Sequence, residues 1–172
     1  AAGNTSQPST PLPVTIDTTP PAQPSAPDLT AATDSGSSPT DNATSVTRPD
    51  FNIGPVPAGV TPELVINGQV VPATATVDGN GNTILTPVNA LPEGTNQVAV
   101  QHVDAAGNTS QPSTPLPVTI DTQAPSAPRV EIPEAAGAVS AAEAANGVQL
   151  QITLPSDAAE GDIIRTVVTP PG

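Results

Sequence analysis

Residues 105–122 read Ala-Ala-Gly-Asn-Thr-Ser-Gln-Pro-Ser-Thr-Pro-Leu-Pro-Val-Thr-Ile-Asp-Thr, and residues 1–18 are identical to them letter for letter. An identity of this length within one chain indicates recently duplicated modules. The two copies start 104 residues apart, which is the size of a small domain rather than of a solenoid unit. We therefore interpret the 172 residues as a segment of a tandem array of domains. Such arrays usually set distance, stiffness or avidity.

The duplicated stretch itself predicts a strand followed by a linker. In residues 116–121, and again in residues 12–17, apolar side chains alternate with proline or polar ones, which is the pattern of a half-buried strand. The prolines indicate an edge position or the beginning of the strand. Residues 18–27 and 122–128 are dense in proline, which favours extended polyproline II backbone. We expect both to be semi-rigid linkers.

Between these linkers, short apolar segments alternate with turn signals about every ten residues, without a helical period. Strands are expected at residues 28–33, around Phe51 and Ile53, at residues 64–66 and 71–77, from Ile84, and at residues 97–103. Turns are expected at Asn67-Gly68 and at residues 78–82, 91–94 and 104–108. About seven short strands predict an all-β fold, an antiparallel β-sandwich of immunoglobulin type, with one complete domain at residues 28–121.

Composition restricts the partners and the core. Sixteen acidic residues and three arginines give a net charge of −13, which argues against nucleic acid and against docking on anionic lipid. No stretch approaches the roughly 20 apolar residues of a membrane span. The chain has no cysteine, so disulfides and zinc–thiolate sites are excluded. Phe51 is the only aromatic residue, so Val, Ile, Leu and Ala must build the core.

Residues 129–172 predict the first half of a following module, just as residues 1–17 predict the last strand of a preceding one. In the trailing part, strand signals occur at Val130 and Ile132 and at Val148, Leu150, Ile152 and Leu154, with a turn at Glu160-Gly161-Asp162. Neither piece is long enough to bury a full core alone. Either the ends of the chain cut through domains, or the two pieces complement each other between neighbouring molecules.

Four motifs taken together resemble the immunoglobulin-like repeats of giant bacterial surface adhesins, the biofilm-associated and repeats-in-toxin (RTX) adhesins. They are Asp-Ser-Gly-Ser-Ser-x-Thr-Asp-Asn-x-Thr (34–44), Asp-Gly-Asn-Gly-Asn (78–82), Asp-Ala-Ala-Gly-Asn-Thr-Ser (104–110) and Val-Thr-Ile-Asp-Thr-x-x-Pro (118–125). The resemblance implies an extender module, secreted to the bacterial cell surface. It would be a monomeric, calcium-rigidified rod whose partners are the neighbouring modules of the same chain. It implies nothing about catalysis.

Calcium is the cofactor that this resemblance implies, and the loop residues are suited to it. The ion takes six to eight hard oxygen ligands from Asp, Asn and backbone carbonyls. In an immunoglobulin-type sandwich, the candidate ligands fall into two groups at opposite ends of the domain. The group where the chain enters is Asp17, Asp104 and Asn108. The group where the chain leaves is Asp34, Asp41, Asn42 and Asp121. An ion at either end would lock a junction. The alternative is that these residues are ordinary turn formers.

No catalytic constellation is visible, so we do not expect an enzyme. His102 is the only histidine, and it shares an inward face with Val98 and Val100, as a structural histidine does. Two other functions stay open. The domain could itself bind a carbohydrate or a protein, although Phe51 is the only aromatic residue available for sugar binding. It could also be an accessory spacer of a secreted hydrolase, which neighbouring sequence would reveal.

Overall fold

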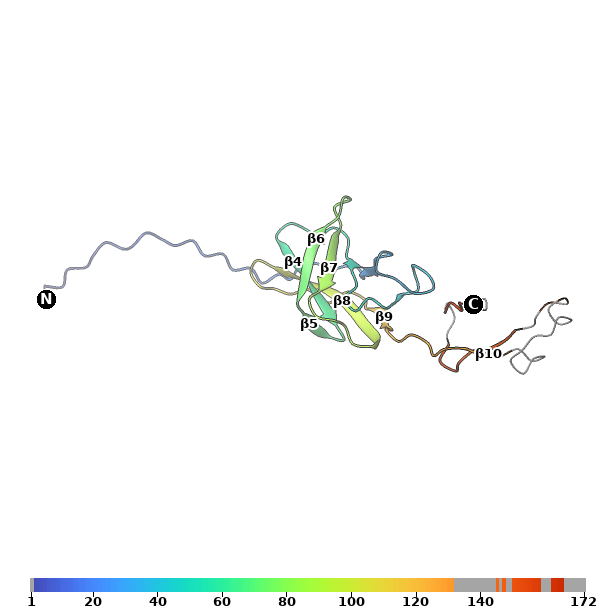
Figure 1. The fold of residues 1–172 in the computed structure, drawn as a ribbon. Coiled ribbons are helices and arrows are strands. Elements are labelled where there is room, and N and C mark those ends of the chain that lie inside the picture. The colour runs from blue at the N-terminus through green and yellow to red at the C-terminus, as the bar shows by residue number, and fades with distance from the viewer. Residues whose placement is uncertain (1, 132–144, 146, 148–149, 159–161, 166–172) are drawn as a thin grey trace, which may run out of the picture.

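The computed structural model describes residues 2–131, 145, 147, 150–158 and 162–165. Residues 28–120 form a sandwich of two β-sheets. The extended residues 2–27 approach the sandwich from one side, and residues 121–131 leave on the opposite side (Figure 1). We call these two ends the N-terminal pole and the C-terminal pole of the domain.

Both sheets have the strand order of an immunoglobulin-type sandwich. The first sheet has the order β1 (Asp28–Leu29), β3 (Phe51–Asn52), β7 (Thr83–Pro87) and β6 (Ala73–Val77). The second has the order β2 (Ala43–Thr44), β9 (Leu116–Ile120), β8 (Gly94–Asp104), β4 (Val60–Ile66) and β5 (Gln69–Val71). All pairs are antiparallel except β2 with β9, which run parallel. The predicted all-β sandwich is therefore confirmed, with nine strands rather than about seven.

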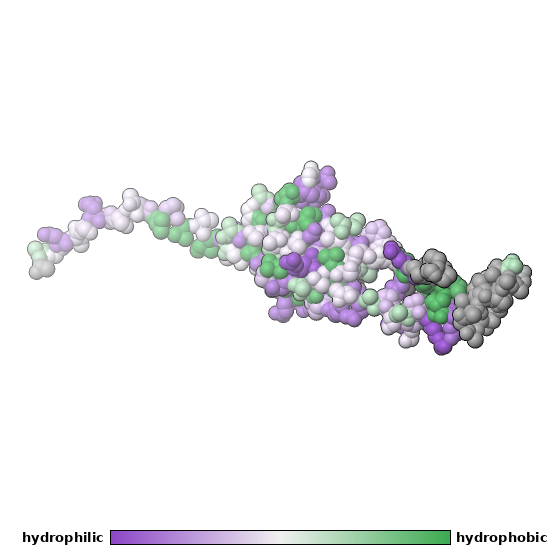
Figure 2. All heavy atoms as spheres, viewed as in Figure 1, coloured by the Kyte–Doolittle hydropathy of each residue, from purple (hydrophilic) through white to green (hydrophobic). Residues whose placement is uncertain are grey.

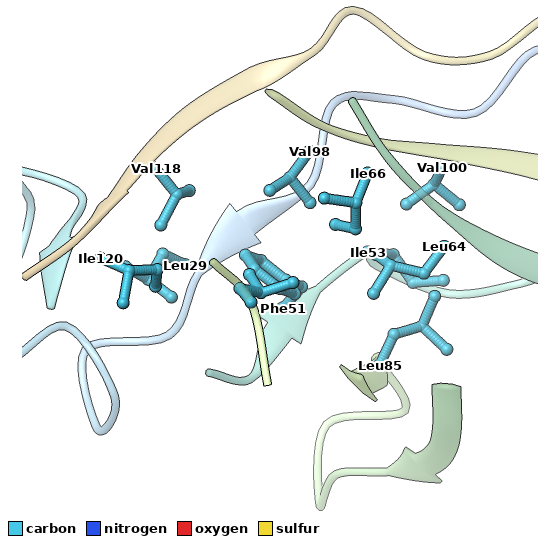
Figure 3. Packing of buried hydrophobic residues seen from close by; sticks show 11 residues of the cluster. Leu29, Phe51, Ile53, Leu64, Ile66, Leu85, Val98, Val100, Val118 and Ile120 are labelled. Atoms are coloured by element: carbon cyan, nitrogen blue, oxygen red, sulfur yellow. The ribbon is translucent and has the colours of Figure 1, made fainter. Parts of the chain in front are cut away.

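The core lies between the two sheets and is almost entirely aliphatic. Phe51 is fully buried at its centre, and the residues around it come from both layers (Figure 3). The other members of the cluster are Leu29, Ile53, Leu64, Ile66, Leu85, Leu91, Val98, Val100, Val118 and Ile120. Val98, Val100 and His102 are all buried along β8, as their period-two spacing predicts.

Two predicted turns form as expected. Asn67 and Gly68 join β4 to β5 with φ angles of 51° and 80°, as a type I′ hairpin requires. The loop from Asp78 to Asn82 joins β6 to β7. A backbone hydrogen bond closes this loop, with Asp78 N donating to Asn82 O at 2.9 Å.

The predicted single strand over residues 71–77 is two strands in two different sheets. Pro72 lies between them, because proline has no N–H to donate to a ladder and its φ is fixed. The chain crosses at this point from β5 in one sheet to β6 at the edge of the other. Val77 is 69% exposed, so the apolar alternation from Val71 to Val77 does not follow one buried face. The first predicted strand also shortens to Asp28–Leu29, since Thr30 O accepts from Thr33 N and Asp34 N in a turn.

Residues 109–115 run beside β8 without forming a regular ladder. The hydroxyl of Ser113 accepts a hydrogen bond from Val100 N at 3.0 Å, and the hydroxyl of Ser110 accepts one from His102 N at 3.0 Å. The backbone N–H groups of the same two serines donate to Val100 O and His102 O. Because prolines interrupt this segment, serine hydroxyls supply acceptors that keep the edge of β8 satisfied.

Residues 12–17, predicted as the last strand of a preceding module, form no strand in this structure. The segment has no strand pairing, and Leu12, Val14 and Ile16 are 83%, 75% and 84% exposed. Figure 2 shows hydrophobic residues along the extended N-terminal segment, away from the body of the domain. A single strand does not form in water without a partner strand and a face to bury.

The trailing segment contains the beginning of another antiparallel pair. β10 (Arg129–Glu131) pairs with β11 (Gln151–Thr153), with Val130 opposite Ile152. The predicted strand residues Ile132 and Val148 and the turn at Glu160-Gly161 lie outside the described residues. In the part of the chain that the structure describes, no helix has the length and apolar character needed to cross a bilayer.

Candidate cation sites and domain junctions

At the N-terminal pole, the structure brings the linker to the loop between β8 and β9. Asn108 Nδ2 donates to the backbone oxygen of Asp17 at 3.1 Å. Farther along the linker, Gln23 Nε2 donates to Pro112 O at 2.6 Å, and the carbonyl of Ala22 lies 3.3 Å from His102 Nδ1. The histidine therefore has a structural partner, and Asp17, Ala22 and Gln23 contact the domain that they precede.

The Asp104 carboxylate is already used inside its own turn. Its Oδ1 accepts from Ala106 N at 2.9 Å and Asn108 N at 2.8 Å, and its Oδ2 accepts from Asn108 Nδ2 at 2.9 Å. These hydrogen bonds, led by the Asn108 side chain, lower the pKa of Asp104. Three of roughly four lone-pair sites are then occupied.

The same turn occurs a second time, at residues 78–82. Asp78 Oδ1 accepts from Asn80 N and Asn82 N at 2.8 Å each, and Oδ2 accepts from Asn82 Nδ2 at 3.0 Å. In both loops the fourth residue is a glycine with positive φ, 84° for Gly81 and 89° for Gly107. The pattern Asp-x-x-Gly-Asn thus builds a self-contained hairpin turn, which accounts for Asp104 and Asn108 as turn formers.

At the C-terminal pole, the loop between β1 and β2 contains a buried carboxylate without a complete set of partners. Asp34 is only 6% exposed. Its Oδ2 accepts from Asn42 N at 3.2 Å, whereas its Oδ1 is buried with no hydrogen-bond partner. Burial raises the pKa of Asp34, and the neighbouring negative charge of Asp41 raises it further. A buried anion of this kind is costly unless a proton or a cation compensates it.

Asp41 is held in position by the loop around it. Its Oδ1 accepts from Ala43 N at 3.0 Å, and its Oδ2 accepts from Ser38 N at 2.9 Å and Ser37 Oγ at 3.0 Å. The hydrogen bond from Ala43 N is the main reason why the pKa of Asp41 lies below its ordinary value. Asp41 therefore stays ionised next to Asp34.

Gly36 packs tightly against the oxygens of Asp41 and Ala43. A Cβ at this position would lie 2.6 Å from Asp41 Oδ1 and 2.7 Å from Ala43 O, so no larger residue fits. The glycine thus lets the loop close around one carboxylate and one backbone carbonyl, which are the ligand types that calcium takes. Among the described residues, no three His, Cys, Asp or Glu side chains gather closely enough to hold a metal. An ion here would have to complete its shell with carbonyl oxygens and water.

The outgoing chain meets this loop through its backbone. Thr119 N donates to Asn42 O at 2.9 Å, and Asp121 N donates to Thr44 O at 3.0 Å. The carboxylate of Asp121 instead accepts from Gln123 N at 2.9 Å, in its own local turn. The structure thus brings Asp34, Asp41 and Asn42 together and places the backbone of Asp121 nearby.

Glu93 is a junction residue that sequence reasoning missed. Its carboxylate accepts from Thr122 N at 3.0 Å and from Thr122 Oγ1 at 2.5 Å. These hydrogen bonds lower the pKa of Glu93, with the hydroxyl of Thr122 as the main cause. The available signal was an acidic residue in a Pro-Glu-Gly corner, at the pole where the chain leaves the domain.

One comparison with known proteins agrees with the immunoglobulin-type sandwich. A comparison with curated proteins found no match. The family model of a bacterial Ig-like domain matches residues 20–122, which is more than half of the chain and includes the whole sandwich. Domains of this family are typically extracellular or surface-exposed and generally non-catalytic. The chain therefore belongs to the bacterial Ig-like domain family.

Proposed function

We propose that this chain is part of an extender of a secreted bacterial surface adhesin, in which tandem Ig-like modules project adhesive domains from the cell for attachment and biofilm formation. The observation that carries the proposal is the pairing of two features. The chain enters and leaves the domain at opposite poles (Figure 1), and the sequence that ends the domain also precedes it at residues 1–18. Modules joined in this way extend in one direction, which suits a spacer.

We further propose that calcium stiffens this extender, and that the loop of Asp34 and Asp41 at the C-terminal pole is its best-supported position. The support is the buried, unpartnered Oδ1 of Asp34, together with the neighbouring negative charge of Asp41. A bound cation would supply the missing counter-charge for a buried carboxylate. Asp17, Asp104 and Asn108 form a second predicted position, although the turn already uses most of the Asp104 oxygens.

A ligand-binding role receives less support. Sugar recognition usually depends on exposed aromatic faces, and Phe51, the only aromatic residue, has 0% exposure in the core. An accessory role in a secreted hydrolase would use the same fold, so the neighbouring sequence has to separate it from the adhesin. Many further copies of this domain would support the extender, whereas a single adjoining catalytic domain would support the hydrolase.

A thermal melt in millimolar calcium and in excess chelator tests the metal. A ligand at 100 times its dissociation constant adds about 2.7 kcal/mol, which should raise the midpoint of a domain near 100 residues by on the order of 10 °C. Asp34→Asn should abolish this shift. Asp78→Asn is the matched control, because it disrupts an Asp turn outside the proposed site and should destabilise the domain while keeping the shift. A wild-type chain without a calcium shift, or an equal shift in Asp34→Asn, would contradict the calcium proposal.

The pH dependence in chelator gives a second readout of the same carboxylate. Because the folded-state pKa of Asp34 is raised above 3.8, the folded domain binds this proton more tightly than the unfolded chain does. The contribution of Asp34 to stability is therefore largest at acid pH and is lost as the pH rises through its folded pKa. Asp34→Asn should gain stability relative to wild type between about pH 4 and pH 7, measured as the difference in melting midpoint. A constant difference across this range would count against an unpaired buried charge.

A further inference from the structure

We infer that the boundary between consecutive copies of this domain is a metal-independent, two-sided clamp on one Asp-Thr dipeptide, closed by Glu93 of the upstream copy and Asn108 of the downstream copy. The inference rests on the tandem arrangement in the proposed function. The dipeptide occurs twice in the chain, as Asp17-Thr18 before the domain and as Asp121-Thr122 after it. The structure therefore displays the two halves of one junction separately.

The upstream half is visible at the C-terminal pole. Thr122 donates to the Glu93 carboxylate through its backbone N, at 3.0 and 3.3 Å to the two oxygens, and through its hydroxyl at 2.5 Å. Glu93 directly precedes Gly94, the first residue of β8, so its backbone is fixed by the sheet. The threonine two residues after the end of β9 is thus tied back to the domain that it leaves.

The downstream half is visible at the N-terminal pole. Asn108 Nδ2 donates to the carbonyl of Asp17 at 3.1 Å, and the same amide group also donates to Asp104 Oδ2. The residues that follow stay on the domain, since Gln23 Nε2 donates to Pro112 O and the carbonyl of Ala22 lies beside His102 Nδ1. The aspartate that ends one module is thus tied to the next module.

The two halves are compatible on a single dipeptide. At both places the aspartate forms the same local turn, with Thr19 N donating to Asp17 Oδ1 at 3.0 Å and Gln123 N donating to Asp121 Oδ1 at 2.9 Å. The upstream clamp uses the N–H and hydroxyl of the threonine, whereas the downstream clamp uses the carbonyl of the aspartate. No atom of the dipeptide is used by both clamps.

In the composite junction, the first two residues after β9 are held from both sides. β9 ends at Ile120, the next residue is held by the downstream copy, and the one after it is held by the upstream copy. A flexible linker would let the modules reorient, but a linker fixed at consecutive residues from both sides transmits orientation. The junction after Thr122 in this chain is similarly tied from downstream, because Asp157 Oδ2 accepts from Ser126 N at 3.0 Å and Ser126 Oγ at 2.6 Å.

The test uses the whole chain with a copy of residues 20–104 placed directly before Ala1, so that residues 1–18 complete the added domain. The chain has no cysteine, so Val77→Cys in both domains places one spin label on each exposed β6 edge. Pulsed electron resonance then measures the distribution of label–label distances in excess chelator. We expect a narrow distribution. Glu93→Ala in the added copy, or Asn108→Ala in the original copy, should widen it about twofold, as release of a linker predicts.

The matched controls are the equivalent substitutions in the opposite domains, Glu93→Ala in the original domain and Asn4→Ala, at the position equivalent to Asn108, in the added one. They change the same side chains away from the shared junction and should leave the width unchanged, while thermal melts verify that every variant is folded. A broad distribution in the unsubstituted chelated protein, or equal widening by junction and control variants, would overturn the clamp.

Repeating the distance measurement with calcium distinguishes the clamp from the calcium stiffening in the proposed function. A distribution that is broad in chelator and narrows only with calcium would refute the clamp while supporting metal stiffening. A distribution that is narrow in chelator and insensitive to calcium would support the clamp while contradicting metal stiffening.

Discussion

In residues 105–122 the side chains of Val118 and Ile120 are fully buried against the opposite sheet, whereas in the identical residues 1–18 the equivalent Val14 and Ile16 are exposed to solvent. Local propensity is the same in both copies, so it cannot explain the difference. The second copy has β8 on one side and β2 on the other, and the first copy has neither. Strand formation at this sequence is therefore decided by neighbours that supply hydrogen bonds and an apolar face.

The difference extends to the polar residues. Ser110 and Ser113 are buried with their hydroxyls bonded to β8, whereas Ser6 and Ser9 in the first copy are exposed. Even the glycine of the turn, which has positive φ in both copies, closes a hairpin only in the second. A substitution in residues 105–122 can therefore be compared with the same substitution at the equivalent position in residues 1–18, where the local sequence is identical.

The largest expected effect comes from the core. Ile120→Ala removes a side chain that is almost fully buried between the sheets and should lower the free energy of unfolding by about 2–5 kcal/mol. Ile16→Ala, its matched control, should change it by less than about 0.5 kcal/mol. Urea denaturation of both variants measures the two values. Comparable losses for both would mean that residues 12–17 pack against the domain in solution.

A smaller loss of stability is expected at Ser113, whose hydroxyl takes the place of a backbone acceptor beside β8. Ser113→Ala leaves Val100 N buried without its acceptor and should cost about 1–3 kcal/mol. Ser9→Ala should have no measurable effect, because its hydroxyl is in water in the first copy. Hydrogen exchange at Val100 N provides the specific readout, since its protection should fall in Ser113→Ala alone. Unchanged protection would show that the hydroxyl is not the acceptor.

The smallest effect is expected at the turn glycine. Gly107 has a φ of 89°, and a Cβ there would meet no atom within 4 Å, so Gly107→Ala costs backbone strain alone, about 1 kcal/mol. Gly3→Ala should cost nothing, because the isolated first copy can change its φ freely. Melting midpoints of the two variants check this order. A midpoint equal to wild type for Gly107→Ala would indicate that the hairpin tolerates another turn geometry.

Much of the sandwich could be predicted from local pattern. The hairpin at Asn67-Gly68, the turns at residues 78–82 and 104–108, and the buried face of Val98, Val100 and His102 follow from period-two alternation and turn chemistry. The crossing at Pro72 could not be located, because alternation continues unchanged from Val71 to Val77. A strand that changes sheets keeps its side-chain period, so pattern alone cannot reveal the change.

The candidate sites were predictable only in outline. The approach of Asn108 to the linker followed from the strand order of an immunoglobulin-type sandwich, and the structure places Asn108 Nδ2 on Asp17 O. The contact between Glu93 and Thr122 was not foreseen, because the two residues are 29 positions apart in the sequence. Nor could sequence separate Asp34, which has a buried and unpartnered oxygen, from Asp104, whose turn satisfies it.

The sequence alone determined the all-β class, the module length of about one domain, the aliphatic core and the positions of the hairpin turns, because these depend on periodicity and on the chemistry of adjacent residues. The tertiary structure alone decided which copy of the duplicated stretch becomes a strand, which carboxylate lies buried without a partner, and which side chains hold the linker at each pole. These outcomes depend on groups far apart in the chain, whose meeting is fixed by the packing of the two sheets around Phe51 (Figure 3).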